Sequence, residues 1–260
     1  MSTASTQVTA GILPSRRNTI VGQLDLIVTP IFFVLLALLF AVVWVYSDFD
    51  QTTTSILEPS RLWTQFQQQI TVALWSTALV IVLAVPLGIL VTREGAPRLK
   101  NNLVTMLGLG QAIPAYGLIV LFFVAFGQGT ITVVLALATF ALLPVLRNTI
   151  VGLEQVDQAV IEAGKGMGLS GFGRLRKIEL PLAVPVIMGG IRTATVINVG
   201  MATLAYLIGG GGLGITIAAG LKTGRPTAIF IGAVLVALIA LALDFFGGIA
   251  QRYLKPKGLA

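Results

Sequence analysis

The sequence predicts an all-α integral membrane protein with about six transmembrane helices. Of its 260 residues, 56% are hydrophobic and only 10% are charged, and the mean hydropathy is +0.94. Soluble domains carry roughly 25% charged residues. Six apolar segments are long enough to cross a bilayer, which takes about 20 residues. Because these segments lack the alternation of a membrane β-barrel, we expect them to be helices.

The six predicted spans are separated by short connections. They are Leu26–Tyr46, Ile70–Thr92, Leu103–Phe126, Thr130–Leu146, Leu182–Ile208 and Thr227–Ala250. The fourth is short, and we expect it to continue through Arg147, Asn148 and Thr149. The first starts too late and runs too long for a cleavable signal peptide, and it lacks a small-x-small cleavage site. No connection has room for a sizeable soluble core.

The distribution of basic residues predicts that both termini are cytoplasmic. With the N-terminus inside, the inner segments hold 13 Lys and Arg residues and the outer segments hold three, and Arg192 lies within a span. Such a bias toward the inner side sets the orientation of membrane proteins. We attribute the net charge of +7 to loops that face anionic lipid and a protein partner, and we expect no nucleic acid to bind.

The composition also argues against several kinds of site. The chain has no cysteine and no histidine, so the commonest metal ligands and the commonest general base are missing. We therefore expect no catalytic residues and no metal site. The phosphate-binding pattern G-x-x-x-x-G-K-[ST] is also absent from the sequence, so we expect the chain to bind no cofactor of its own.

The most specific motif is the polar, glycine-rich segment between the fourth and fifth spans. Three residues separate Glu162-Ala163-Gly164 from Gly168, nine separate Gly168 from Ile178, and one separates Ile178 from Leu180-Pro181. The apolar residues Val156, Val160, Ile161 and Met167 stand among charged residues, as in a short amphipathic helix. Pro181 suits the first turn of the next helix.

This spacing resembles the cytoplasmic "EAA" loop of bacterial ABC-importer permeases, the binding-protein-dependent inner membrane components. The family more often has a second alanine where this chain has Gly164. Further segments resemble the osmoprotectant branch, which imports glycine betaine, choline, carnitine and similar compounds. These segments are Gln111–Ala115, Leu143–Thr149, Gly190–Ala194 and Ala202–Gly214.

The resemblance implies a type I importer permease fold and a domain organisation. Residues 1–25 would form a cytoplasmic tail, 26–69 the first helix and an outer segment, and 251–260 a second cytoplasmic tail. Residues 70–250 would form the permease domain, with the docking loop at 154–181. The residues that match the docking motif are Glu162, Ala163, Gly164, Gly168, Ile178, Leu180 and Pro181.

The resemblance also implies the partners. Two permease subunits, identical or paralogous, would enclose the path in the bacterial inner membrane, and partner ATPase subunits would hold ATP and magnesium. An extracytoplasmic binding protein would deliver the solute. The same machine importing an amino acid, a sulfonate or another small zwitterion stays an alternative. An ATP-independent channel or carrier is disfavoured because only one acid lies within a span.

Two further features carry two interpretations each. Arg192 and Asp244 are the only ionisable residues well inside the predicted spans, and they either form a structural pair or line the solute path. We favour the pair. The segment Gly209, Gly210, Gly211, Gly212, Leu213 and Gly214 is either an outer gate that turns back toward the membrane or a flexible loop. We favour the gate because Ile215–Leu221 is apolar.

Overall fold

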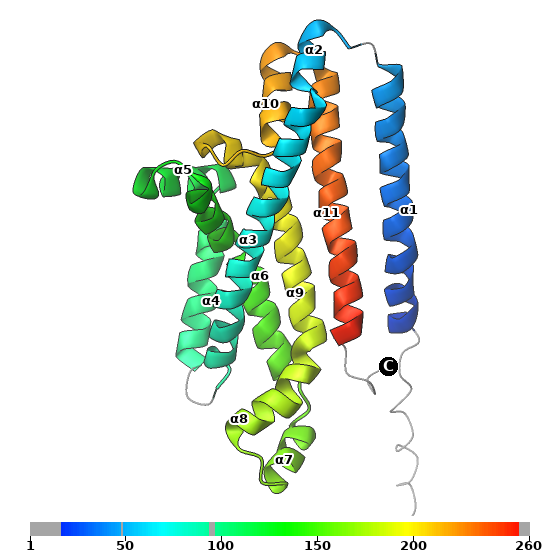
Figure 1. The fold of residues 1–260 in the computed structure, drawn as a ribbon. Helices are drawn as coiled ribbons and strands as arrows, with labels where there is room; N and C mark the ends of the chain where they lie inside the picture. The colour runs from blue at the N-terminus through cyan, green and yellow to red at the C-terminus, as the bar shows by residue number, and fades with distance from the viewer. Residues whose placement is uncertain (1–16, 48, 94–96, 255–260) are drawn as a thin grey trace, which may run out of the picture.

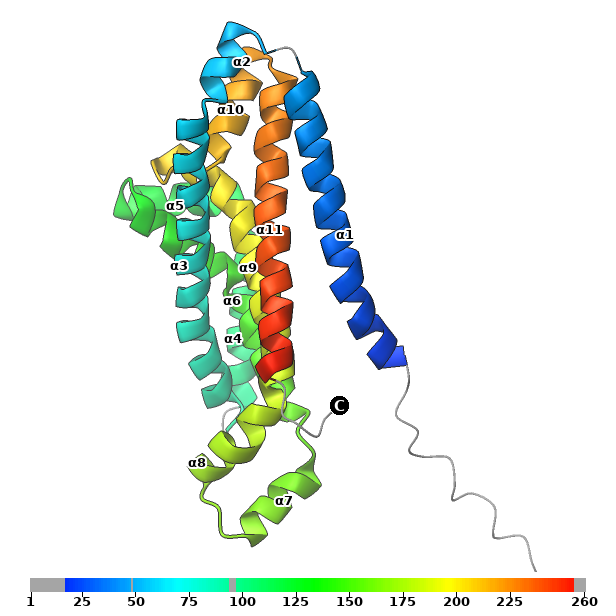
Figure 2. The same ribbon diagram turned by 45° about the vertical axis from the view of Figure 1, so that its right-hand side comes forward.

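The computed structural model is a bundle of long helices (Figures 1 and 2). It describes residues 17–47, 49–93 and 97–254, and no strand occurs in these ranges. The predicted N-terminal tail lies outside the described residues up to residue 16, and so does the C-terminal tail from residue 255 onward.

Five helices are long and apolar enough to cross a membrane, and a bent pair of helices makes a sixth span. The prediction of about six spans is therefore confirmed. The long helices are α1 (Arg17–Tyr46), α3 (Pro59–Val91), α6 (Thr130–Glu154), α9 (Leu180–Met201) and α11 (Pro226–Leu254). The fourth span continues beyond Leu146 to Glu154, and α9 ends in a turn of 3-10 helix, η2 (Ala202–Ile208).

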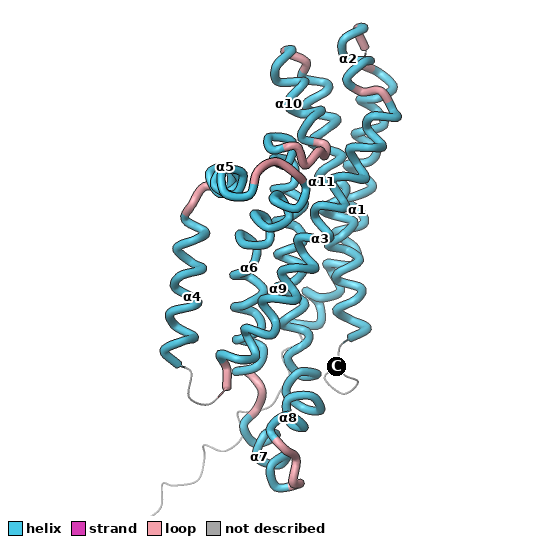
Figure 3. Tube along the Cα trace, turned by 60° about the vertical axis from the view of Figure 1, so that its left-hand side comes forward, coloured by secondary structure: helices cyan, strands magenta, loops and turns pink. Residues whose placement is uncertain are grey.

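The third predicted span is not one continuous helix. It consists of α4 (Pro97–Ala112) and α5 (Ala115–Phe126), which meet at an angle of 99°. Pro114 causes the break, because it has no N–H to donate and its backbone is extended, with φ −55° and ψ 136°. Figure 3 shows α4 running along the bundle and α5 turned away from its end.

The segment expected to form an outer loop, Ser47–Gln69, is largely helical. It contains α2 (Gln51–Ile56) and the first turns of α3, which begins at Pro59. The Asp50 carboxylate caps α2 by accepting a hydrogen bond from the Thr53 N–H (3.1 Å). Hydrogen bonding from the side chain and the backbone of Thr53, together with the nearby Arg225 guanidinium, lowers the pKa of Asp50 below its usual range. With 33 residues, α3 is about 50 Å long and extends beyond the roughly 30 Å hydrocarbon layer.

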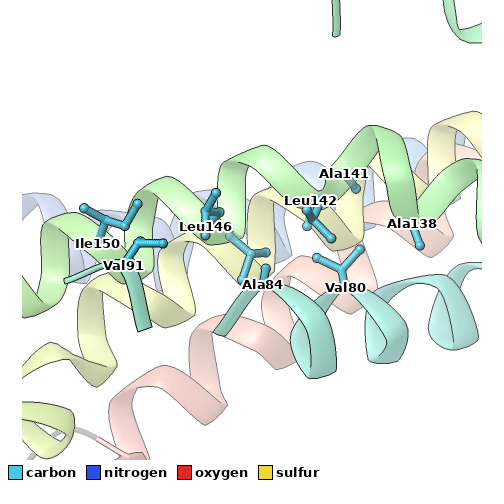
Figure 4. Packing of buried hydrophobic residues seen from close by; sticks show 10 residues of the cluster. Val80, Ala84, Val91, Ala138, Ala141, Leu142, Leu146 and Ile150 are labelled. Atoms are coloured by element: carbon cyan, nitrogen blue, oxygen red, sulfur yellow. The ribbon is translucent and has the colours of Figure 1, made fainter. Parts of the chain in front are cut away.

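The core lies where α3, α6 and α9 pack together. Val80, Ala84 and Val91 of α3 meet Leu142 and Leu146 of α6 in one buried cluster (Figure 4). The backbones of α6 and α9 approach closely at small residues, as is usual between membrane helices. A Cβ atom on Gly190 would lie only 2.9 Å from the carbonyl oxygen of Pro144.

Helix α1 lies at the edge of the bundle, beside α11 (Figure 2). Phe40, Val43 and Trp44 pack against the core, but no residue of its apolar span is fully buried. Helix α1 begins and α11 ends at the end of the molecule that carries α7 (Gln158–Gly166) and α8 (Gly171–Arg174) (Figure 1). We call this the loop end, and the opposite end, with α2 and α10 (Gly214–Thr223), the turn end.

Candidate docking loop, ion pair and outer turn

The segment with the docking motif folds as a compact helical hairpin at the loop end. Helix α7 agrees with the short helix expected over Val156–Met167, and Asp157 caps it by accepting a hydrogen bond from the Ala159 N–H (2.8 Å). Helix α8 and a π-helical turn, Leu175–Glu179, lead directly into α9. Leu180 and Pro181 form the first turn of α9.

Two motif glycines have different structural roles. Gly168 follows the end of α7 with φ +74°, a conformation that glycine adopts without steric cost. Nothing lies within 4 Å of a Cβ built on it. Gly164 is buried, and a Cβ there would lie 2.7 Å from Cδ1 of Ile178. The residue that departs from the family pattern thus lets α7 pack closely on Ile178.

The outer face of α7 is exposed and partly apolar. Val160 and Met167 are exposed, with Ala163 between them, and Phe172 of α8 is 73% exposed. Glu162 is also exposed and pairs with Lys165 at 2.7 Å. The hydrogen bond from Lys165 and its charge lower the pKa of Glu162, so this carboxylate stays ionised at neutral pH. Exposed apolar groups beside fixed charges are typical of a protein-binding surface.

Glu179 joins this loop to α3, and the sequence analysis did not single it out. Its side chain is buried and accepts a hydrogen bond from Nη2 of Arg93 (2.7 Å), just beyond the end of α3. The other carboxylate oxygen of Glu179 lies 4.0 Å from Nε of Arg174 in α8. The only hint in the sequence is an acid that follows Arg174, Arg176 and Lys177. The structure shows that one carboxylate holds α3 and the loop together.

We expect Glu179→Gln to weaken this connection. The variant leaves two guanidinium groups without an anion, which should lower the free energy of unfolding by about 1–3 kcal/mol. It should also reduce ATP hydrolysis stimulated by the transported solute, measured in the assembled transporter. Glu154→Gln is the control, because Glu154, the last residue of α6, forms a comparable ion pair at the same end with Lys100 of α4 (2.6 Å). Equal effects of the two variants would contradict the assigned role.

The structure brings Arg192 and Asp244 together. Arg192 of α9 binds Asp244 of α11 through two parallel hydrogen bonds, Nε to Oδ1 (2.9 Å) and Nη2 to Oδ2 (2.7 Å). Gln251 accepts a third hydrogen bond from Arg192 (3.2 Å) and donates one to the carbonyl of Pro185 (2.6 Å). The ion pair thus belongs to a network that links α9 to α11.

A groove of about 390 Å³ opens beside this pair. Besides the two charged residues it is lined by Gly189, Thr193, Val196 and Ile197. The lining contains no aromatic ring, although aromatic faces are the usual partners of quaternary ammonium groups. Each side chain of the pair already has an opposite charge as partner, so we interpret the pair as structural.

The glycine-rich turn at the turn end has a defined conformation. Gly209, Gly211 and Gly212 have positive φ angles of 78°, 74° and 94°. A Cβ on Gly214 would overlap the carbonyl of Thr203, at 1.7 Å. The chain then continues into α10, which packs against α11. Specific contacts of this kind do not fit the alternative of a flexible loop, and the role of the segment as an outer gate stays a prediction.

Three glutamines of α3 make those contacts. Gln68 accepts a hydrogen bond from the Gly212 N–H (3.0 Å), and Gln65 accepts one from the Thr216 hydroxyl. Gln69 is fully buried, accepts from the Leu213 N–H (3.1 Å) and donates to the carbonyl of Val199 (2.8 Å). The sequence analysis placed these glutamines in an outer loop and missed them. Their spacing on one face of an apolar helix is the signal that could have found them.

We expect Gln69→Leu to destabilise the turn end strongly. The substitution leaves the Leu213 N–H and the Val199 carbonyl buried without partners, which should lower the free energy of unfolding by about 2–4 kcal/mol. Gln67→Leu is the matched control, because Gln67 is exposed on the same helix. Thermal unfolding in detergent measures both. If Gln69→Leu unfolded at the same temperature as the control, the hydrogen bonds of Gln69 would not contribute to the stability of the fold.

These features define a multi-pass helical membrane protein, and the comparisons with known proteins identify its family. The chain belongs to the binding-protein-dependent transport system inner membrane components, whose family model matches residues 84–258. This membership makes it a membrane component of a transport system and not an enzyme.

Several relatives are similar over most of their length. The glycine betaine/carnitine/choline transport system permease protein OpuCB of Bacillus subtilis is 39% identical over 190 residues, 72% of this chain and 86% of that one. The choline transport system permease protein OpuBB of the same organism is 40% identical, covering 74% and 88%. The osmoprotectant import permease protein OsmW of Salmonella typhimurium is 37% identical, covering 75% and 91%.

A solved structure confirms the fold class. A chain of the MetNI methionine ABC transporter, in inward-facing conformations, superposes with a TM-score of 0.67. The match covers 76% of this chain and 99% of that chain at 22% identity. The type I importer permease fold predicted from the sequence is therefore confirmed.

Proposed function

We propose that the protein is the permease subunit of an ATP-driven importer for a compatible solute such as glycine betaine, choline or carnitine. The observation that carries this proposal is the identity of 37–40% to osmoprotectant permeases over about three quarters of the chain. The likeness to the methionine transporter concerns the fold alone. An amino acid, a sulfonate or another zwitterion remains the second candidate cargo.

The docking loop supplies the proposed route of coupling. We place the loop end in the cytoplasm, in agreement with the excess of basic residues there. The exposed face of α7, with Glu162 and Met167, would lie in a groove of a partner ATPase subunit, which holds ATP and magnesium. Closure of two ATPase subunits would move two such loops together. Glu179 and Arg93 would pass this movement to α3, because their ion pair joins the two elements.

The turn end would face the binding protein. The six-residue segment 209–214 and helix α10 lie there, and we propose that this segment acts as the outer gate. Its hydrogen bonds to Gln68 and Gln69 of α3, together with the bond from Thr216 of α10 to Gln65, would hold it closed. A second permease subunit, identical or paralogous, would complete the path.

Two measurements test the proposal. Calorimetry with the associated binding protein, against glycine betaine, choline, carnitine and amino acids, identifies the cargo. ATP hydrolysis by the assembled transporter in lipid discs should then rise when the loaded binding protein is added. Binding of an amino acid alone would change the cargo to the second candidate. Solute uptake without any ATPase partner would refute the importer assignment.

A further inference from the structure

A basic residue inside α6 lies where the sequence analysis expected a helix to be ending. Arg147 precedes the end of α6 at Glu154 by seven residues, or about 10 Å. Its side chain is exposed, and its guanidinium lies over Gly108 of α4, where a Cβ would be 3.9 Å from Nη2. Gly108 itself is well inside α4, far from the start of that helix at Pro97.

Arg147 lies in a groove of about 310 Å³ between α4 and α6. The groove is lined by Lys100, Asn101, Val104, Thr105, Arg147, Ile150 and Val151. Lys100 is neutralised by Glu154 at 2.6 Å. Over residues 17–47, 49–93 and 97–254, neither a carboxylate nor any other hydrogen-bond partner contacts the Arg147 side chain.

Arg147 differs from Arg192 in its hydrogen-bond partners. A cationic side chain within the membrane normally faces protein partners or a water-filled cavity, because its transfer to hydrocarbon is costly. Arg192 has Asp244 and Gln251 as hydrogen-bond partners. Arg147 lies in a groove whose two uncharged polar side chains, Asn101 and Thr105, make no hydrogen bond within the part of the chain that the structure describes.

The chemistry of the groove selects an anion of a particular shape. A guanidinium binds a carboxylate through two parallel hydrogen bonds, and an amide and a hydroxyl beside it can donate further ones. The groove has no aromatic residue and no carboxylate, so it offers nothing to a quaternary ammonium group. A phospholipid phosphate would sit at the interface, near the level of Lys100, which is already paired.

We infer that Arg147, with Asn101 and Thr105, binds the carboxylate of a zwitterionic solute as it moves between α4 and α6. This inference rests on the proposed function for the identity of the solute. The proposed site binds the carboxylate end of the solute alone. Solutes with a carboxylate should therefore depend on Arg147, and choline, which has no carboxylate, should not.

The first test needs no transport assay. Thr105→Cys introduces the only cysteine of the chain, and the variant is assembled with its partners in lipid bilayers. We expect an anionic methanethiosulfonate to react faster than a cationic one, and Arg147→Gln to reduce this preference about fivefold or more. A cysteine that does not react from water, or a preference indifferent to Arg147, would overturn the inference. Reaction that occurs only without anionic phospholipid would assign the groove to lipid phosphate instead.

The second test compares two solutes that share a trimethylammonium group. In proteoliposomes with the ATPase and binding protein, Arg147→Gln should lower uptake of glycine betaine about tenfold or more, as expected for a lost charged hydrogen-bond partner. Uptake of choline should change less than about twofold. Arg147→Lys should retain part of the betaine uptake, because it keeps the charge.

Lys222→Gln is the control for the labelling test, because Lys222 is an exposed basic residue on α10 at the turn end, away from the groove between α4 and α6. In the uptake test, choline is the internal control for each variant. Equal loss of both solutes, or loss of neither, would contradict a carboxylate site. A wild-type transporter that moves neither solute would refute the proposed function. The labelling of Thr105→Cys would still decide whether the groove attracts anions.

Discussion

Glu162→Lys is expected to abolish solute-stimulated ATP hydrolysis while the permease still inserts and folds. Glu162 is 63% exposed and contacts only Lys165 in its own helix, so reversal of its charge removes no core contact. The reversal does change the surface that we propose to meet the ATPase, from an ion pair to two cations next to Ala163 and Met167. A like charge placed in an interface costs far more than an exposed pair contributes.

A closely matched pair at the turn end provides the control. Glu58 and Arg61 are also three residues apart, exposed, and joined at 2.8 Å. Glu58→Lys should therefore affect stability about as little as Glu162→Lys but keep the ATPase subunits bound, with their ATP hydrolysis in the absence of binding protein unchanged. Both variants are measured by thermal unfolding in detergent and by ATPase activity in the assembled transporter. Normal stimulation in Glu162→Lys would show that α7 is not the docking helix.

Gly168→Asp tests the same surface through the backbone. The positive φ of Gly168 disfavours any side chain, whereas Gly166 lies in the helix and also has open space around it. Gly168→Asp should thus disturb the turn after α7 and reduce coupling, and Gly166→Asp should have the smaller effect. If the double variant Glu162→Lys, Gly168→Asp transports normally, the docking assignment is wrong.

The ionisation state of Glu162 also predicts how solute-stimulated ATP hydrolysis depends on pH. Its folded-state pKa is lowered, first by the hydrogen bond from Lys165 and then by the charge of that residue. The pair is therefore fully formed above the ordinary pKa of 4.5 and is lost only as the pH falls through the lower folded value. Between about pH 6 and 8 its charge is constant, so no change in coupling should arise from this group.

Features set by local sequence could be predicted, and the docking loop is the clearest case. The spacing from Glu162 to Pro181 placed α7 and the start of α9 correctly. The break at Pro114 could not be predicted in the same way, because Pro86 and Pro144 also interrupt apolar runs. Helices α3 and α6 continue through those two prolines. Leu142, Leu143 and Val145 around Pro144 are buried, so tertiary packing maintains the helix there.

Contacts between segments that are distant in the sequence were the other feature that could not be predicted. Glu179 meets Arg93, and Gln69 meets Leu213, across long separations that no local pattern encodes. Both acceptors lie in segments that composition alone assigns to polar loops. The contact between Arg192 and Asp244 could be predicted, because a charge inside a span needs a partner and each residue was the only candidate for the other. The cost of an unpaired charge in hydrocarbon thus made one long-range contact predictable.

The same cost predicts the outcome of a double-mutant cycle on that pair. Arg192→Ala and Asp244→Ala should each lower the free energy of unfolding by about 2–4 kcal/mol, because each leaves one charge within the bundle unpaired. The two side chains are 24% and 27% exposed, which keeps the expected loss below that of a fully buried pair. The double variant should lose less than the sum, with a coupling of about 1–3 kcal/mol.

A second cycle, on Lys100 and Glu154, separates this result from the general effect of ion pairs in the molecule. That pair is more exposed, at 29% and 47%, and it lies at the ends of α4 and α6, so its coupling should stay below about 1 kcal/mol. Thermal unfolding in detergent measures both cycles. Additive losses at Arg192 and Asp244 would contradict a structural pair. A loss of solute uptake without a loss of stability, with ATPase docking intact, would then favour a place for both residues on the solute path.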